Sequence, residues 1–202
     1  SIAVNGKDIT LTIDSKLQQY GEYLMKGKRG GIIALEPSSG EILALVTSPS
    51  YDPNMMVGRL RSPNSVKLIG DSINKPMYDR GLKGTYPPGS PFKLVNALIG
   101  LQEDVIDENT HFFCNGGYRY GNRKKEFMKC HCDIYGKPIQ LNSAISKSCN
   151  SYFANTYKRI IEKNNTPIEG MNNWSSHVRS FGLGNYLGYD LPEGDKGLIP
   201  NG

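Results

Sequence analysis

Residues 86–93 read Tyr-Pro-Pro-Gly-Ser-Pro-Phe-Lys, a loop that leads directly into a helix. Neither a helix nor a central strand continues through the Pro-Pro-Gly run. Ser90 and Pro91 stand where an N-cap and a first helical residue belong. The apolar spacing from Leu94 to Leu101 predicts that the helix extends to about residue 103. The stretch therefore predicts the start of a core helix, with Ser90 as its cap.

Lys93 does not suit such a helix start. It falls in the first turn, where the macrodipole disfavours a cation and where Glu or Gln would complete a capping box. A lysine three residues after a serine lies on the same helix face and can accept the proton of the serine. Two interpretations of Ser90 remain open at this point: a helix cap, or a nucleophile with Lys93 as its base.

The composition bounds the function classes. The chain has 202 residues and a formal net charge of +5, which suits one domain or a domain with a subdomain. The basic residues are dispersed except for the run at 123–125, so we expect no nucleic-acid partner. No apolar run approaches the ~18 residues that span a membrane, and no signal peptide opens the chain. The beginning at Ser1 is compatible with an anchor that precedes it.

The first half of the chain predicts strands and one helix. Alternating residues at 8–13 predict a short strand, and Asp14 caps a helix over about 16–26. Strands at 32–35 and 41–48 flank a turn and predict a hairpin. Residues 55–85 show little periodicity and read as a long connection, which is usually functional or mobile.

The second half predicts helices around an irregular segment. Residues 104–139 are rich in Gly, Asn, Tyr and Cys and show no periodicity, whereas 140–147 and 151–162 have helical spacing. Trp174 marks a further short helix and is expected in the core. His111 and His177 are expected on the surface or in loops, and the last twenty residues predict no element.

A second polar cluster, Ser146-Lys147-Ser148-Cys149-Asn150-Ser151, lies between two of these helices. One interpretation is that Ser148, Asn150 or Ser151 caps the helix that follows. The other is that Ser148 and Asn150 form a second polar arm of a serine–lysine site. A hydroxyl there can relay a proton, and a carboxamide can hold both the lysine and a substrate amide.

The pairing of Ser90-x-x-Lys93 with Ser148-x-Asn150 is two of the three motifs of penicillin-binding proteins and serine β-lactamases. Residues 31–45, 79–90 and 181–184 resemble further segments of the class B penicillin-binding protein transpeptidase family, of the elongation type. The resemblance implies an α+β transpeptidase fold with an N-terminal β-hairpin and a mostly helical subdomain. It covers nearly all of 1–202 as a partial transpeptidase domain, with 1–30 as a lead-in strand and helix.

The resemblance also implies roles for the four motif residues. Ser90 would attack the D-Ala-D-Ala carbonyl of a peptidoglycan stem peptide, with Lys93 as general base. Ser148 would relay the proton, and Asn150 would position the lysine and the substrate. β-Lactams would acylate Ser90. The implied partners are stem peptides, β-lactam antibiotics and a membrane glycosyltransferase, at the periplasmic face of the inner membrane, with an N-terminal helix as anchor.

One departure from the family pattern concerns the third motif, Lys-Ser/Thr-Gly on a strand, which this sequence lacks. We therefore expect a C-terminally truncated domain that lacks the last strands and that β-lactams acylate slowly. A serine β-lactamase shares the first two motifs but needs a deacylating base, which nothing here identifies. A non-catalytic β-lactam sensor or a zinc-stabilised binding module is the remaining alternative.

Four cysteines, Cys114, Cys130, Cys132 and Cys149, form the last candidate site. In an envelope protein four cysteines predict two disulfides, with three possible pairings. The Cys130-His131-Cys132 spacing instead favours a tetrahedral thiolate site, with His131 as reserve ligand. The resemblance implies zinc, because some family members carry it near the second motif, with one ligand at the position of Cys149. Zinc on an insertion over 104–149, disulfides and free thiols all remain open.

Overall fold

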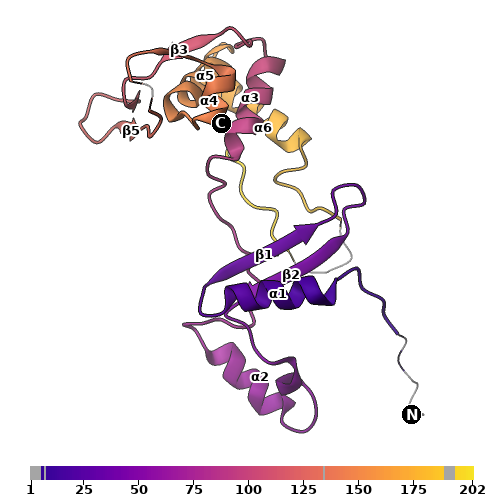
Figure 1. The fold of residues 1–202 in the computed structure, drawn as a ribbon. Helices are drawn as coiled ribbons and strands as arrows, with labels where there is room; N and C mark the ends of the chain where they lie inside the picture. Colours follow the sequence, from indigo (N-terminus) through magenta and orange to yellow (C-terminus); the bar gives the residue numbers. More distant parts are fainter. Residues whose placement is uncertain (1–5, 7, 134, 189–193) are drawn as a thin grey trace. The chain divides into compact units, whose positions relative to one another are not determined.

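The computed structural model describes residues 6, 8–133, 135–188 and 194–202, which form helices and antiparallel strands (Figure 1). The described residues fall into two compact units. The first contains the residues up to Gly84 together with 194–195, and the second contains residues from Thr85 to 188 together with 196–202. Within the described ranges, no helix combines the length and the apolar character needed to cross a bilayer.

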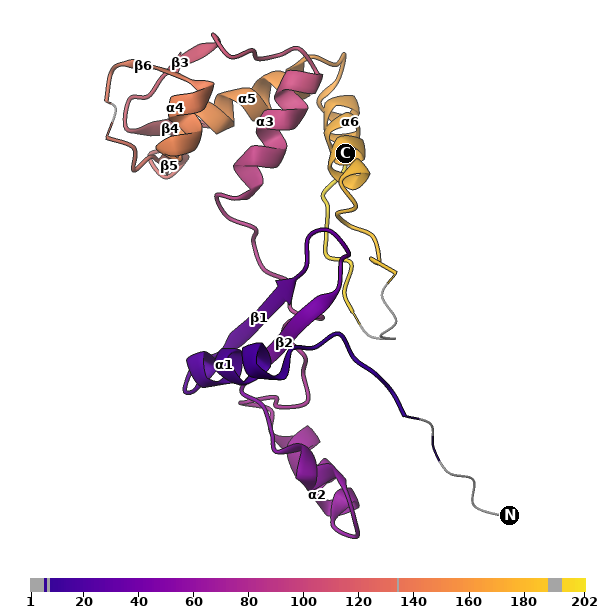
Figure 2. The same cartoon turned by 45° about the vertical axis from the view of Figure 1, so that its right-hand side comes forward.

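The first unit is built on an antiparallel hairpin of β1 (Gly30–Leu35) and β2 (Ile42–Ser48), as the sequence predicted. Helix α1 (Ser15–Met25) packs along this hairpin (Figure 2). The predicted cap is confirmed, because the Asp14 carboxylate accepts hydrogen bonds from the first amides of α1. Gly21 faces Val46 so closely that a Cβ would lie 2.8 Å from the valine side chain. A glycine therefore sets the distance between helix and strand.

The strand predicted at 8–13 is wrong for the residues that the structure describes. Residues 8–14 form no strand, although Thr12 Oγ1 donates to the Ile42 carbonyl at 2.6 Å and the Asp14 amide donates to the Leu43 carbonyl at 2.9 Å. Ile9 is 83 % exposed. The alternating pattern has no continuous partner strand and no core to face, and a strand needs both.

The connection predicted at 55–85 contains two helical elements. They are the 3-10 helix η1 (Pro53–Met56), which begins just before it, and α2 (Arg61–Gly70). Pro63 does not prevent α2, because it lies in the first helical turn, where an amide has no intrahelical partner to lose.

The segment that precedes Ser90 is held to the hairpin by buried polar contacts. Arg80 is only 6 % exposed, and its guanidinium donates to the carbonyls of Asn74 at 2.6 Å and Lys75 at 3.3 Å. The Asp79 carboxylate accepts from Thr47 Oγ1 at 2.8 Å and from the Gly81 amide at 2.9 Å. These contacts give Arg80 and Asp79 a structural role, which accounts for the two polar residues without a role in catalysis.

The second unit is mainly helical. Its helices are α3 (Phe92–Gln102), α4 (Leu141–Ser146), α5 (Asn150–Glu162) and α6 (Pro167–Ser180). Helix α5 contacts the other three. Trp174 is a core residue as predicted, being 6 % exposed, and its indole N–H donates to Asn96 Oδ1 at 2.8 Å. Helices α3 and α5 pack against each other, and the start of α3 lies beside the start of α5.

The segment predicted as irregular contains two short antiparallel pairs. Strand β3 (His111–Phe113) pairs with β6 (Pro138–Gln140), and β4 (Gly117–Arg119) pairs with β5 (Phe127–Lys129). Three residues are too few for a detectable alternation. The pairs bring Cys114, Cys130 and Cys132 to the start of α5.

His177, predicted on the surface or in a loop, is partly exposed but lies on a helix and not in a loop. It lies on α6, and its Nε2 is 2.5 Å from Glu103 Oε1. The same carboxylate accepts from Lys163 Nζ at 3.0 Å and from Asn173 Nδ2 at 3.1 Å. The hydrogen bonds from His177 and then Lys163 lower the pKa of Glu103 to about 2. This carboxylate links the ends of α3 and α5 to α6.

We expect Glu103→Gln to reduce the acid sensitivity of the fold. Because the pKa of Glu103 in the folded chain is about 2 and its ordinary value is 4.5, its ionised form stabilises the fold above pH 4.5 and this contribution is lost as the pH falls towards 2. Screening limits it to about 2 kcal/mol. Urea unfolding at pH 7 and pH 3 measures it. An exposed control, Glu162→Gln, should change neither value by more than about 0.5 kcal/mol.

Candidate active site

Ser90 lies in the turn that precedes α3. The left-handed Gly89, with φ of 65°, allows this turn. The N-cap position belongs to Pro91, and no side chain caps the helix there, so the predicted cap by Ser90 is wrong. Its hydroxyl instead accepts a hydrogen bond from Ser148 Oγ at 3.0 Å. The side chain is exposed and available to a substrate.

Lys93 extends from the first turn of α3 to the second motif. Its Nζ donates to Ser148 Oγ at 2.9 Å, to the Ser148 carbonyl at 2.7 Å and to Asn150 Oδ1 at 2.6 Å. It also lies 5.9 Å from the centre of the Phe153 ring. The structure thus brings Ser90, Lys93, Ser148 and Asn150 together in one chain of contacts, over 55 residues of sequence separation.

Burial lowers the pKa of Lys93, although the negative charge of nearby cysteine thiolates acts in the opposite direction. The positive end of the α3 dipole, close to the ammonium, also favours the neutral amine. A lysine with a lowered pKa is neutral in a larger fraction of molecules, and only the neutral amine can accept a proton. Lys93 therefore has the electrostatic setting of a base.

The turn between α4 and α5 presents Ser148 and Asn150. The expectation that Ser148, Asn150 or Ser151 caps α5 is wrong, because the cap is Cys149, whose Sγ accepts from the Tyr152 amide at 3.4 Å. Asn150 is held on both sides. Its Nδ2 donates to the Lys129 carbonyl at 2.9 Å, and its backbone amide donates to Cys130 Sγ at 3.2 Å.

Ser148 adopts a left-handed backbone, with φ of 50°. This conformation costs a non-glycine residue about 1 kcal/mol, and it aims the hydroxyl between Lys93 and Ser90. The strained backbone thus keeps the Ser148 hydroxyl within hydrogen-bond distance of both Lys93 and Ser90.

Two substitutions distinguish the effect of the Ser148 hydroxyl from the effect of its left-handed backbone conformation. If Ser148 relays a proton from Ser90 to Lys93, both Ser148→Ala and Ser148→Gly should slow acylation of Ser90 by about 100-fold, because each removes the hydroxyl. Ser148→Gly should be more stable than Ser148→Ala by about 1 kcal/mol, because glycine adopts positive φ without strain. Penicillin labelling rates and urea unfolding measure the two effects. Labelling of either variant at the native rate would exclude a relay by this hydroxyl.

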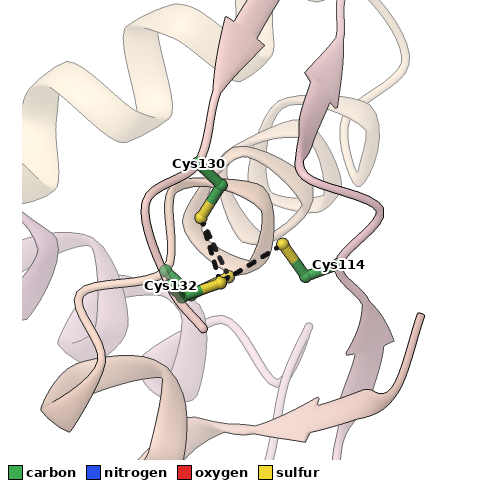
Figure 3. Close-up of side chains that lie close together, drawn as sticks. Cys114, Cys130 and Cys132 are labelled. Carbon is green, nitrogen blue, oxygen red and sulfur yellow. Dashed lines mark hydrogen bonds between the residues drawn. The ribbon is translucent and has the colours of Figure 1, made fainter. Parts of the chain in front are cut away.

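The four cysteines form one cluster. Their sulfur atoms all lie within 4.8 Å of one another, and Figure 3 shows those of Cys114, Cys130 and Cys132 turned toward one another. Cys130 Sγ is 3.2 Å from Cys132 Sγ, and Cys132 Sγ is 3.3 Å from Cys114 Sγ and 3.7 Å from Cys149 Sγ. These separations exceed the ~2.05 Å of a disulfide. None of the four cysteines forms a disulfide.

The donor set fits a tetrahedral metal site. Thiolates at about 2.3 Å from a zinc ion are separated by about 3.8 Å, so only a small outward shift of the shortest pairs is needed. Desolvation acts to raise the pKa of Cys130, but hydrogen bonds from the Cys132 and Ser151 amides lower it to about 6. Burial raises the pKa of Cys149. His131 is exposed and is not a member of the cluster.

The motifs do not reveal every contact of the site. The Lys129 carbonyl fixes the Asn150 amide, but any residue could supply a carbonyl there, so the sequence contains no signal for it. Phe153 contacts Lys93 from the first turn of α5, and the helical prediction alone could have placed it on that side. The first contact depends on how β5 meets α5, and the second on how α3 meets α5.

Comparison with known proteins shows the same fold elsewhere. Residues 30–202 match the penicillin binding protein transpeptidase domain family. The chain is 36 % identical over 196 residues to the peptidoglycan D,D-transpeptidase MrdA of Acinetobacter baumannii. The aligned residues make up 97 % of this chain and 28 % of that protein. The chain therefore spans less than a third of this relative.

Solved structures agree with this assignment. The structure of Pseudomonas aeruginosa PBP2 in complex with WCK 5153 is similar with a TM-score of 0.80 and 35 % identity, over 98 % of this chain and 42 % of that one. The complex between PBP2 and MreC from Helicobacter pylori is similar with a TM-score of 0.77 and 30 % identity, over 94 % of this chain and 33 % of that one. The α+β transpeptidase fold is thus shared, and the chain belongs to the penicillin-binding protein transpeptidase family.

Proposed function

We propose that this chain carries the acyl-transfer site of a peptidoglycan D,D-transpeptidase that cross-links the cell wall during elongation. The observation that carries the proposal is the chain of contacts from Ser90 Oγ through Ser148 Oγ to Lys93 Nζ, at 3.0 and 2.9 Å. A serine nucleophile needs a base that accepts its proton, and a hydroxyl between the two can pass that proton on. The similarity to MrdA supports the choice of a stem peptide ending in D-Ala-D-Ala as the donor.

The proposed reaction begins with neutral Lys93. Ser90 Oγ attacks the penultimate D-Ala carbonyl while its proton passes to Ser148 Oγ, and the Ser148 proton passes to Lys93 Nζ. Hydroxyl protons rotate freely enough to reverse the direction of these hydrogen bonds. Collapse of the tetrahedral intermediate breaks the peptide bond, and the proton returns to the departing D-Ala nitrogen. The backbone amide of Ser90 would donate to the oxyanion, and Asn150 would keep Lys93 and the substrate amide in place.

The same nucleophile would react with β-lactams, because their strained amide presents an equivalent carbonyl. The family name and the similarity to PBP2 structures support this. We place the site at the periplasmic face of the inner membrane, next to a membrane glycosyltransferase of the elongation machinery. The complex of the related Helicobacter pylori PBP2 with MreC makes an MreC-type protein a further candidate partner.

We propose that the metal of the four-cysteine cluster is zinc. The four sulfurs, three of them on buried residues, form the donor set that structural zinc sites use. Bound zinc would compensate the charge of the thiolates and join the β3–β6 segment to the start of α5. It would lie outside the chemistry, with Asn150 as its nearest connection to Lys93.

Labelling with a fluorescent penicillin tests the acyl-transfer site. We expect one adduct per chain, located at Ser90 by peptide mass spectrometry and absent from Ser90→Ala. The control Ser146→Ala removes a nearby exposed hydroxyl that donates to the Ser143 carbonyl of its own helix, and it should label at the native rate. The adduct should persist for hours. Rapid turnover would indicate a β-lactamase, and labelling that survives Ser90→Ala would exclude this nucleophile.

A further inference from the structure

Two sulfurs of the cysteine cluster are held by the first turn of α5. Cys130 Sγ accepts from the Asn150 amide at 3.2 Å, and Cys149 Sγ accepts from the Tyr152 amide at 3.4 Å. A disulfide requires its sulfurs to approach to ~2.05 Å, so a new bond from either of these sulfurs would pull it away from its amide. These two cysteines are therefore poor partners for oxidation.

The other two sulfurs belong to separate loops. Cys114 follows β3 and Cys132 follows β5, 18 residues further along the chain. Their sulfur atoms lie 3.3 Å apart and are turned toward each other (Figure 3). An approach of about 1 Å would bring them to the length of a disulfide. This pair can therefore be joined with a small movement of two loops and without a change in α5.

A bond between Cys132 and Cys130 is less favourable, although their sulfurs are 3.2 Å apart. Only His131 separates these two cysteines, so a disulfide would close a very small ring and depart from the preferred backbone spacing and dihedral angle. It would also compete with the hydrogen bond from the Asn150 amide to Cys130. Cys114 is thus the better partner for Cys132.

Cys132 is the most exposed member of the cluster. It is partly exposed, whereas Cys114, Cys130 and Cys149 are all buried. The oxidation of cysteine follows thiolate character and exposure, and metal binding keeps cysteines deprotonated. A small oxidant therefore reaches Cys132 first, with the Cys114 sulfur directly behind it.

We propose that Cys132 and Cys114 form a modification site for peroxides, at which Cys132 is oxidised and Cys114 closes a disulfide. The inference goes beyond the proposed acyl transfer and does not depend on it. The Cys132 thiolate attacks one oxygen of hydrogen peroxide. A sulfur–oxygen bond forms, the oxygen–oxygen bond breaks, and the hydroxide that leaves takes up the thiol proton as water.

The second step joins the two cysteines. The Cys114 thiolate attacks the sulfur of the Cys132 sulfenic acid, a sulfur–sulfur bond forms, and the sulfur–oxygen bond breaks. The hydroxide that leaves takes up the Cys114 proton as a second water. Two thiols are oxidised to one disulfide, and hydrogen peroxide is reduced to two waters, without any further reactant.

Oxidation changes what the cluster can hold. Cys130 and Cys149 would be the remaining thiols, and two sulfurs are fewer than a structural zinc site uses, so the proposed metal should leave. The disulfide would then join the two loops in place of the metal. Cys130 would still accept from the Asn150 amide, so the contact of Asn150 with Lys93 would be kept.

Treatment of the chain as purified with hydrogen peroxide tests the inference, after its zinc content has been measured. The thiol count should fall from four per chain to two, and any bound zinc should appear in solution, where a chromophoric chelator detects it. Peptide mass spectrometry should find Cys114–Cys132 as the main disulfide. A thiol reductant should restore all four thiols. The control His131→Ala changes an exposed neighbour outside the cluster and should oxidise within about twofold of the native rate.

A second variant tests the order of the two steps. Cys114→Ser removes the resolving thiol, so the sulfenic acid of Cys132 should accumulate and react with dimedone at least about tenfold more than in the native chain. If this variant does not fold, the disulfide found in the native chain still decides. A main disulfide other than Cys114–Cys132 would overturn the inference. So would four intact thiols at a peroxide concentration that fully oxidises a short peptide with one cysteine. A chain without zinc that forms this disulfide would reject only the proposed metal, and absent penicillin labelling would reject only the proposed acyl transfer.

Discussion

Cys149→Ala is expected to lose bound zinc and to unfold at much lower denaturant concentration. Cys149 is fully buried, caps α5 and contributes one of four sulfurs. Its removal leaves three ligands and a small cavity. Because the binding energy of a structural zinc is folding energy, we expect a loss of about 3–5 kcal/mol. Elemental analysis should fall from about one zinc per chain to well below that value.

The control for this substitution is Ser151→Ala. Ser151 is also buried at the start of α5, but its hydroxyl makes only a long contact of 3.5 Å with the Phe113 carbonyl. It should keep its zinc and lose less than about 1.5 kcal/mol. Treatment of the native chain with a strong chelator should reproduce the loss of stability. Stoichiometric zinc in Cys149→Ala would rule out Cys149 as a ligand.

Lys93→Ala is expected to slow acylation of Ser90 by about 1,000-fold, the usual contribution of a positioned general base. Lys93→Arg should be almost as slow, because a guanidinium keeps the charge but cannot accept a proton. This pair of variants separates a base from a fixed positive charge. Lys147→Ala is the control, since this exposed lysine bonds to Asp133 at 2.8 Å and should label within twofold of the native rate.

The pH dependence gives a second test of the same role. The native labelling rate should rise with pH until Lys93 is neutral, and its lowered pKa moves that rise to lower pH than for an ordinary lysine. Lys93→Arg should lose this rise. Stopped-flow fluorescence of penicillin labelling from pH 6 to 10 measures it. Native labelling by Lys93→Arg, with a native pH profile, would show that another group accepts the proton.

Motif spacing predicted the members of the site but not how they are held. Ser90, Lys93 and Asn150 were assigned from short motifs, and the structure brings them together because α3 and α5 start side by side. Their roles remain predictions. The capping residues were wrong at both helices, since Pro91 and Cys149 hold those positions. A serine at a helix start has two possible partners, and local sequence alone does not decide between them.

Helices and strands with a strong apolar periodicity were predicted correctly, whereas strands that depend on a partner strand elsewhere in the chain were not. The hairpin and the helices at 92–102 and 150–162 follow from apolar spacing. The prediction of a strand at 8–13 was wrong because an alternating pattern cannot supply a partner strand. The four strands β3, β4, β5 and β6 were not predicted because three residues are too few to show a period. The pairing of His177 with Glu103 joins residues 74 positions apart, so it depends on tertiary structure.

Asn150 makes contacts in two directions. Its side chain accepts from Lys93 and its backbone amide donates to Cys130 Sγ, so one residue contacts both Lys93 and the cysteine cluster. Free-energy coupling between two sites is reciprocal. If metal occupancy alters the reversible affinity of the site for an antibiotic before acylation, then that reversible binding alters the metal affinity by the same factor. The affinity of the cysteine cluster for its metal would then depend on whether an antibiotic is bound.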